Sequence, residues 1–226
     1  DQHTHPEAQA REDARRLLDV LTPVVKSWPA RYGAAANDMA IQVLGGAGYT
    51  RDYPLEQLYR DQRLNMIHEG AEAIHGVDLL GRKVVMEQGA GLRLFVEAVR
   101  RDAQRAAEAG LKDEAAALGA ALDRLAGTSE QLVALQRDEP DLALANATLY
   151  LDAFGRVALA WIWLQQGRVA TLALAGASVE ATDHCCGKLQ AMRYFFRWEL
   201  PVTEAQWPVL SRVDRSAFDM RDAWFA

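Results

Sequence analysis

The hydrophobic positions follow helical spacing along most of the chain, and no segment shows the alternation typical of a strand. Leu17, Leu21 and Val24 recur every three or four residues and define one face of a predicted helix. Residues 55–139 and 141–200 contain no proline and are rich in alanine, leucine, arginine, glutamate and glutamine, which all favour helices. The pattern predicts an all-α protein.

Prolines and glycines mark where these helices are expected to end. Trp28 and Pro29 are expected to interrupt a first helical stretch, and Gly45 and Gly46 to end the second. The expected helices cover residues 6–27, 32–44, 54–60, 70–87, 92–109, 112–137, 142–177 and 179–199.

The chain is expected to have two parts, joined near residues 89–91. Residues 1–88 are interrupted by loops and hold the glycine-rich and mixed-charge motifs. Residues 92–226 hold long helices, which are expected to pack as an antiparallel bundle.

Composition excludes several classes of protein. Half of the 226 residues are hydrophobic, and 25 Lys and Arg against 31 Asp and Glu give a formal net charge of −6. An acidic chain lacks the positive charge that nucleic acids attract, so no nucleic-acid partner is expected. The most apolar run, 157–164, is too short to span a bilayer. The chain does not begin with Met, so we expect a processed product or a piece of something longer.

The only two cysteines, Cys185 and Cys186, are adjacent and cannot form a disulfide framework. We therefore expect a reducing compartment, the cytoplasm. Asp183 and His184 precede them, but adjacent cysteines do not both reach one tetrahedral ion without strain. No metal site is predicted, and the thiols are interpreted as packing groups.

The segment 41–84 carries the candidate chemistry, and each feature has two interpretations. Gly45 and Gly46 allow a ligand or a neighbouring chain to approach the backbone closely, or they simply end a helix. Arg60, Asp61 and Arg63 are interpreted either as a site for a charged ligand or as a structural ion-pair cluster at a helix end.

Glu69 stands between two predicted helices, flanked by Ile67 and Gly70. Partial burial there raises the pKa of a carboxyl group and makes it a candidate general base. The alternative is an ordinary solvated loop glutamate.

Four motifs in fixed order resemble the C-terminal helical domain of the acyl-CoA dehydrogenase family. They are Gly45-Gly46-Ala47-Gly48-Tyr49, Pro54-Leu55-Glu56, Arg60-Asp61 and Ile67-His68-Glu69-Gly70. Segments 155–163 and 187–196 resemble the accessory C-terminal domain of the family's long members, which are similar to 3-methylthiopropionyl-CoA dehydrogenase. The resemblance implies a helical-bundle domain of acyl-CoA dehydrogenase type followed by a second antiparallel bundle.

The resemblance also implies roles for individual residues. Glu69 matches the base that removes the α-proton of an acyl-CoA thioester while a hydride leaves to FAD, and its backbone N–H matches a donor to the thioester oxygen. Gly70 matches a residue that lies against substrate. The positions that match FAD contacts, partly to FAD of a neighbouring subunit, are Gln42, Val43, Leu44, Gly45, Gly46, Ala71 and Ala73. A homo-oligomer and an electron-transferring flavoprotein as partner are implied.

The chain departs from the family pattern at three positions and in extent. His68 replaces a usual tyrosine, Ala71 a usual threonine and His75 a usual glutamine, which leaves the base in place but affects the expected flavin contacts. No counterpart of the family's N-terminal helical domain or middle β-domain is present in these residues. We therefore expect a C-terminal fragment that is inactive alone, or else a non-catalytic helical scaffold or oligomerisation module of the same fold.

Overall fold

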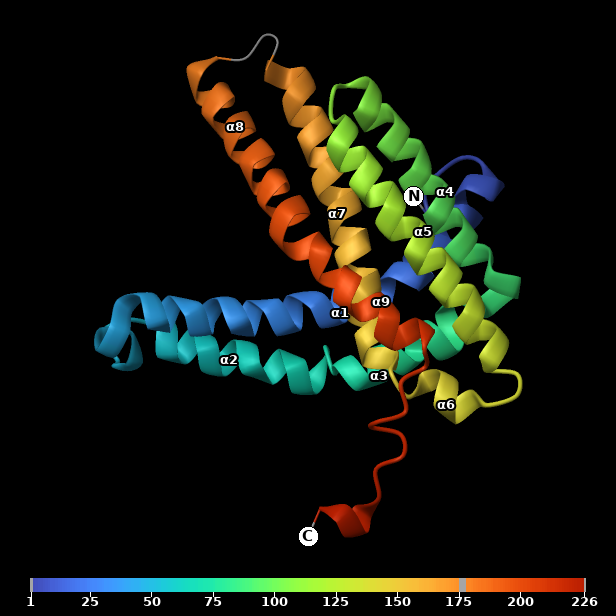
Figure 1. The fold of residues 1–226 in the computed structure, drawn as a ribbon. Coiled ribbons are helices and arrows are strands. Elements are labelled where there is room, and N and C mark those ends of the chain that lie inside the picture. Colours follow the sequence, from blue (N-terminus) through green and yellow to red (C-terminus); the bar gives the residue numbers. More distant parts are fainter. Residues whose placement is uncertain (1, 175–177, 226) are drawn as a thin grey trace.

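The computed structural model describes residues 2–174 and 178–225, and every regular element in this part of the chain is helical (Figure 1). The all-α prediction is confirmed. The α-helices are α1 (Ala8–Leu44), α2 (Leu55–His68), α3 (Glu72–Asp78), α4 (Met86–Glu108), α5 (Lys112–Leu135), α6 (Pro140–Leu144), α7 (Ala147–Ala173), α8 (Val179–Tyr194) and α9 (Thr203–Ser211). The shorter 3-10 and π-helical turns are η1 (Gly45–Tyr49), η2 (Leu79–Lys83), η4 (Phe195–Glu199), η5 (Leu200–Val202) and η6 (Asp222–Trp224).

Helix α1 continues through Trp28 and Pro29, so the predicted interruption there is wrong. A proline leaves the carbonyl four residues earlier without its helical hydrogen bond, and here that carbonyl belongs to Val25. Val25 and Pro29 are both exposed, so water can reach this side of the helix. On the packed side, Trp28 stacks on Tyr32 with ring centroids 4.1 Å apart. Tertiary packing therefore overrides the proline signal.

Other helix boundaries also differ from the prediction. Helix α2 extends to His68 because residues 61–69 contain no glycine or proline. The helix expected over 70–87 consists of α3 and the π-helical turn η2. The one expected over 142–177 is divided at Asn146, whose side chain donates to the Asp214 carbonyl (2.8 Å). The last three residues of that prediction, 175–177, lie outside the described residues.

The core lies within an antiparallel bundle of α4, α5, α7 and α8, which α9 and the first half of α1 also contact (Figure 1). Phe95 stacks on Phe154 at 4.8 Å and meets the edge of Trp161 at 5.7 Å, and all three side chains are buried. Val20 and Val24 of α1 belong to the same core. This core therefore contains side chains from both sides of residues 89–91, and the division into two domains stays a prediction.

The second half of α1, η1 and α2 project from the bundle as a two-helix hairpin (Figure 1). We call this hairpin, residues 31–68, the arm. Its two helices run antiparallel, so the 42–49 turn lies at the far tip and His68 lies near the bundle. The arm thus carries the motifs within residues 42–61 away from the core, while the motif at residues 67–70 lies at its base.

A left-handed turn marks the joint between the two expected parts. Glu87, Gln88 and Gly89 have φ values of 49°, 57° and 81°, two residues before the break predicted at 89–91. The Glu87 carboxylate accepts from the guanidinium groups of Arg15 and Arg16 on α1. Because left-handed geometry is unfavourable for non-glycine residues, these ion pairs help to hold the turn.

Among the described residues one helix, α7, passes a test of length and composition for a membrane span. However, 72% of its most apolar window is buried inside the protein. Its apolar side chains, including Phe154 and Leu164, form the core of the bundle.

Candidate functional site: the Glu69 loop and the arm

Glu69 lies in a short loop between α2 and α3. The backbone N–H groups of Glu69 and Gly70 both donate to the Asn65 carbonyl, at 3.2 and 2.7 Å, and α3 begins at Glu72. His75 Nε2 lies 2.7 Å from the Glu69 carbonyl oxygen. A carbonyl oxygen only accepts, so His75 carries its proton on Nε2 and donates it. Hydrogen bonds from both flanking helices therefore fix the backbone of the loop.

Gly70 allows the loop to pack directly on α1. It is buried, and a Cβ atom added there would lie 2.2 Å from Ala30 Cβ and 2.8 Å from the Lys26 carbonyl oxygen. No side chain fits in that space without a shift of backbone. The structure thus shows a packing reason for this glycine, while its predicted contact with substrate stays a prediction.

The Glu69 carboxylate is open to solvent in this chain, with its side chain 59% exposed, and lies 2.9 Å from Lys26 Nζ. The hydrogen bond from Lys26, and then its charge, lower the pKa of Glu69. The prediction of a partly buried carboxyl group with a raised pKa is therefore wrong for this chain alone. The physical reason is that the described residues leave the loop uncovered, so desolvation is too small to oppose the lysine.

The five consecutive candidate FAD contacts, residues 42–46, are all exposed at the tip of the arm. Gly45 ends α1 with φ +59°, which explains a glycine there as a helix terminator. Gly46 has no such φ, and no atom lies within 4 Å of a Cβ added to it. The packing of this chain does not require a glycine at residue 46, so this backbone is open to close approach from outside.

The tip and the Glu69 loop lie at opposite ends of α2. This helix has 14 residues, which at 1.5 Å per residue separates the two ends by about 20 Å. Ala71 and Ala73, the other candidate FAD contacts, lie beside Glu69, half-buried and exposed respectively. The structure therefore brings Glu69, Gly70, Ala71 and Ala73 together but keeps residues 42–46 apart from them.

The charges of the Arg60-Asp61 motif do not form an ion-pair cluster in the described chain. Arg60 is 82% exposed and makes one long contact, 3.6 Å, to Glu56, while Asp61 and Arg63 are exposed without an ion pair among the described residues. Arg60 and Arg63 instead line an open hollow of about 560 Å³. The other residues that line it are Asp38, Ile41, Tyr49, Arg51, Glu56 and Tyr59. The structural ion-pair interpretation is thus wrong for the described residues.

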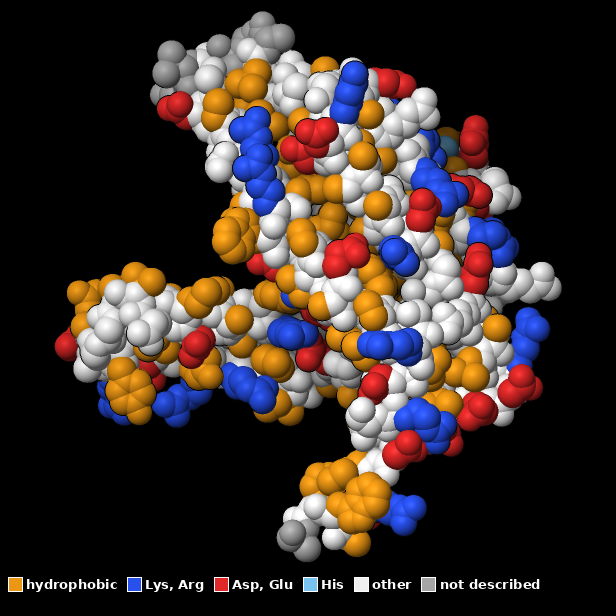
Figure 2. Space-filling model, in the orientation of Figure 1, with side chains coloured by type: hydrophobic (Ala, Val, Ile, Leu, Met, Phe, Trp, Pro, Cys, Tyr) orange, Lys and Arg blue, Asp and Glu red, His pale blue; other side chains and the backbone are white. Residues whose placement is uncertain are grey.

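Large apolar side chains are unusually exposed on the arm and on α3 (Figure 2). Val43 is 84% exposed, Tyr49 82%, Ile67 66% and Ile74 68%. The others on the arm and α3 are Met39, Leu44, Tyr53, Leu58, Tyr59, Leu64 and Val77. Extended apolar surface of this kind marks an interaction site. The Glu69 loop lies within it, between Ile67 and Ile74.

A buried charged pair on α7 was not predicted from the sequence. Asp152 and Arg156 are only 8% and 7% exposed, and Arg156 Nε donates to Asp152 Oδ2 at 3.0 Å. Arg156 also donates to the Glu199 carboxylate at 2.7 Å. The available signal was an aspartate and an arginine four residues apart within an otherwise apolar helix, which places both charges on the buried face.

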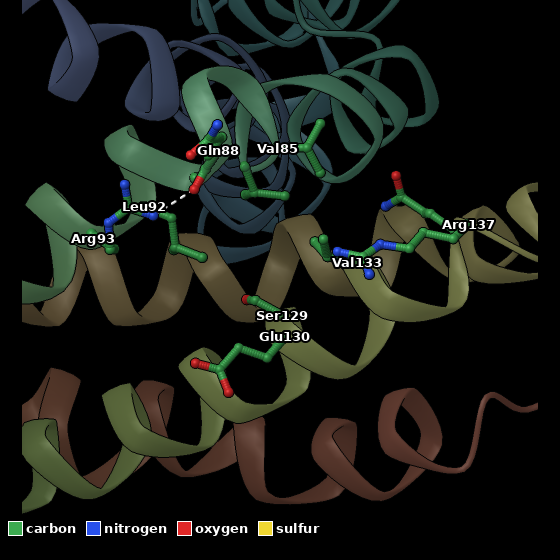
Figure 3. A pocket seen from close by; sticks show the side chains of 11 residues that line it. Val85, Gln88, Leu92, Arg93, Ser129, Glu130, Val133 and Arg137 are labelled. Carbon is green, nitrogen blue, oxygen red and sulfur yellow. Dashed lines mark hydrogen bonds between the residues drawn. The ribbon is translucent and has the colours of Figure 1, made fainter.

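A hollow of about 570 Å³ opens between the start of α4 and the end of α5 (Figure 3). Arg93 and Arg137 lie at opposite ends of it, with Val133 between them (Figure 3). The Ser129 hydroxyl at its wall is already bonded to the Leu125 carbonyl. None of the predicted site residues lines this hollow, so it is separate from the Glu69 loop.

Cys185 is buried and Cys186 is exposed, so the two thiols face different surroundings. Among the described residues, no group of three or more His, Cys, Asp or Glu side chains is arranged to hold a metal ion.

Two family models match the chain: "Acyl-CoA dehydrogenase, C-terminal domain" at residues 4–85 and "Acetyl-CoA dehydrogenase C-terminal like" at residues 95–221. The chain is 29% identical over 220 residues to the broad-specificity linear acyl-CoA dehydrogenase FadE5 of Mycobacterium tuberculosis, covering 94% of this chain and 36% of that protein. It is 33% identical over 171 residues to 3-methylmercaptopropionyl-CoA dehydrogenase of Ruegeria pomeroyi, covering 70% of this chain and 27% of that protein.

A butyryl-CoA dehydrogenase of Syntrophomonas wolfei is 25% identical over 231 residues, covering 99% of this chain and 37% of that relative. The chain thus spans between about a quarter and two fifths of the length of these relatives. The resemblance seen in the motifs of the arm is confirmed, because both models cover most of the described helices. This chain belongs to the acyl-CoA dehydrogenase family.

Proposed function

We propose that this chain supplies the catalytic base of an FAD-dependent acyl-CoA dehydrogenase, with Glu69 removing the α-proton of an acyl-CoA thioester. The observation that carries the proposal is the position of Glu69, a carboxylate in a fixed loop within an exposed apolar surface. A domain that covers Ile67 and Ile74 also excludes water from Glu69 and raises its pKa toward the working pH. The site is complete only when that cover is present.

The loop offers further groups for the same reaction. Negative charge develops on the thioester oxygen as the α-proton leaves, and hydrogen-bond donors directed at that oxygen stabilise it. The Glu69 N–H makes the longer of the two bonds to the Asn65 carbonyl, 3.2 Å, and Gly70 N–H retains the shorter one. Glu69 N–H is therefore the more weakly bonded of the two donors, and we propose that it donates to the thioester oxygen when substrate binds, while Gly70 N–H keeps its bond to the end of α2.

FAD fits the open backbone at the tip of the arm. The site has space at Gly46, where no atom of this chain lies within 4 Å of an added Cβ. Residues 42–46 would hold the adenosine half of one FAD, and Ala71 and Ala73 would lie beside the flavin of another. Acceptance of a hydride from the substrate β-carbon is the chemistry that FAD supplies when bound. His75 donates to the Glu69 carbonyl, a bond that the amide of the usual glutamine could also donate.

The exposed apolar side chains of the arm support a homo-oligomer, because extended apolar surface of this kind marks an interaction site. The resemblance to the family assigns residues 42–46 to the FAD of a neighbouring subunit. We propose that the arm supplies the interface between the two subunits. An electron-transferring flavoprotein is the proposed acceptor of the electrons. Without flavin-binding domains, the chain is expected to turn over no substrate.

A scaffold or oligomerisation module of the same fold is the second candidate. The exposed Glu69 carboxylate, paired with Lys26 and held at a lowered pKa, favours it, because a surface ion pair needs no catalytic role. In that case the arm binds a partner, and Glu69 is an ordinary loop glutamate.

Deuterium wash-in at the α-carbon of an acyl-CoA distinguishes the two. The test uses Glu69→Gln in the longer protein, in which this chain accompanies flavin-binding domains, with exposed Glu97→Gln on α4 as the matched control. For a base, exchange falls by about 10²–10⁴-fold while the bound FAD spectrum is unchanged. Equal exchange in both variants refutes the assignment of Glu69, and absence of both FAD and exchange in the parent supports the scaffold.

A further inference from the structure

The buried charges of α7 form a cluster that joins four parts of the chain. Asp152 Oδ2 accepts from Arg156 Nε at 3.0 Å and from Gln206 Nε2 of α9 at 2.6 Å. Its other oxygen, Oδ1, accepts from the Tyr32 hydroxyl at 3.2 Å, and Tyr32 in turn accepts from Arg156 Nη2 at 2.6 Å. Arg156 also bonds the Glu199 carboxylate at 2.7 Å. Each charge has several partners, so the cluster has little freedom to rearrange.

Arg31 links this cluster to the Glu69 loop. Its Nη1 lies 3.2 Å from Asp152 Oδ1 and 3.1 Å from Glu72 Oε1. Glu72 is the first residue of α3 and directly follows the loop. On the other side of the loop, Lys26 of α1 bonds Glu69. Two cations of α1, Lys26 and Arg31, thus bind the two ends of the loop. Of these two, Arg31 also pairs with a residue of α7, Asp152.

Helix α7 also supports α3 through its backbone. A Cβ atom added to the buried Gly76 of α3 would lie 2.7 Å from the Ala147 carbonyl oxygen, so α3 rests directly on the start of α7. The segment after Glu69 is therefore placed by α7 in two ways: a direct steric contact at Gly76, and an ionic link from Asp152 through Arg31 to Glu72. The first contact involves no residue of the arm, and the second passes through the first residue of the arm.

We propose that Asp152 is a positioning residue for the Glu69 loop, acting through Arg31 and Glu72. The bundle formed by α4–α9 is then a working part of the candidate site, because its α7 sets where the loop stands relative to α1. That Asp152 positions the loop is inferred from the contacts alone, whereas the importance of this positioning for the reaction rests on the proposed function.

The first experiment measures amide hydrogen exchange of Glu69 and Gly70 in this chain by NMR. Arg31→Gln removes the link at the exposed end, since the Arg31 side chain is 41% exposed, and leaves the buried pair of Asp152 and Arg156 in place. We expect the two loop amides to exchange at least tenfold faster, while core amides of α7 keep their rates. Asp152→Asn should give the same loop effect if the variant folds.

Ser129→Ala is the matched control, because it also removes a buried polar group but has no contact with the loop or with Arg31. If the cluster has a merely structural role, this control and Asp152→Asn should change the exchange rates of the loop amides equally. The proposal is overturned if they do, or if Arg31→Gln leaves the loop amides within twofold of the parent. Arg31→Lys, which keeps the charge, should restore part of the protection.

The second experiment uses the longer enzyme and separates this proposal from the proposed function. Arg31→Gln should lower kcat at least tenfold with KM nearly unchanged, because a displaced base affects proton removal more than binding. If kcat is unchanged although the loop amides exchange faster, Asp152 is not a positioning residue for catalysis. If Glu69→Gln leaves α-proton exchange intact, the proposed function fails, while the exchange rates of the loop amides still decide whether α7 positions the loop.

Discussion

Substitution of Gly70 by alanine tests the packing of the loop on α1. The added Cβ would lie 2.2 Å from Ala30 Cβ and 2.8 Å from the Lys26 carbonyl oxygen, and neither atom belongs to a flexible side-chain end. Overpacking of this kind costs about 1–3 kcal/mol of the free energy of unfolding. For a chain of 226 residues each kcal/mol lowers the melting temperature by about 2–4 °C, so we expect Gly70→Ala to lower it by roughly 2–12 °C.

Gly46→Ala is the matched control for this measurement. Gly46 also lies in the motif-bearing segment, but no atom lies within 4 Å of its added Cβ, and its φ is not left-handed. The unfolding free energy of the Gly46→Ala variant should stay within about 0.5 kcal/mol of that of the parent protein. Thermal and urea unfolding, followed by circular dichroism, measure both variants. Equal stability of Gly70→Ala and Gly46→Ala would show that the loop does not pack on Ala30 as described.

A double-mutant cycle identifies the contact itself. Ala30→Gly removes the 2.2 Å contact, although a glycine inside a helix costs about 1 kcal/mol. The double variant should therefore be less destabilised than the sum of the two single variants, by about 1 kcal/mol. Some cost remains, since the Lys26 carbonyl oxygen is still 2.8 Å from the added Cβ. Strictly additive effects would contradict a direct contact between residues 30 and 70.

Three further predictions concern the charges and the core. Lys26→Met should raise the pKa of Glu69 toward its ordinary value, because the hydrogen bond and charge of Lys26 lower it; carboxyl-carbon NMR titration measures this, and an unchanged pKa contradicts the ion pair. The pKa values of Glu69 and Glu87 are both lowered by neighbouring cations, so the ion pairs of these carboxylates stabilise the fold fully above about pH 5 and are lost as the pH falls through the lowered pKa values. The melting temperature should therefore be level from about pH 7 to 5 and fall below about pH 4.5. A melting temperature that rises below about pH 4.5 would contradict the stabilising direction assigned to these ion pairs. Tyr150→Phe removes the buried hydroxyl that donates to Ser129 Oγ and should cost about 1–2 kcal/mol by urea unfolding, with no cost expected if that bond is absent.

The sequence was sufficient for the fold class and for most helices of the bundle, because helix propensity, apolar spacing and the absence of proline all agreed over residues 92–139 and 141–200. It failed at Pro29, where the cost of a proline is offset by contacts that no local pattern reveals. Trp28 stacks on Tyr32 and packs closely on the backbone of Gly155, where an added Cβ would lie 2.6 Å from the Trp28 ring. Local signals predict where a helix is easily broken, and tertiary packing decides whether it breaks.

For the candidate site, the motifs identified Glu69 but not its surroundings. Lys26, which pairs with Glu69, is 43 residues away in the sequence, and Arg31 is 121 residues away from Asp152. Such contacts depend on how α1 crosses the loop and α7, which helical periodicity does not contain. The low exposure of Asp152 was readable in principle, since an aspartate within the apolar run of α7 needs a partner, although the identity of that partner was not.

The turn of Glu87, Gln88 and Gly89 has a consequence for how the chain can vary in length. Three residues separate it from the end of η2, and the long part of α4 follows it immediately, so its residue count sets the rotation of α4 about its own axis. Loss or gain of one residue there would rotate α4 by about 100°, since a helix has 3.6 residues per turn. Phe95 and Val99, now fully buried, would then face water. A glycine-containing stretch that looks like a tolerant linker is thus one of the places least able to accept an insertion or a deletion.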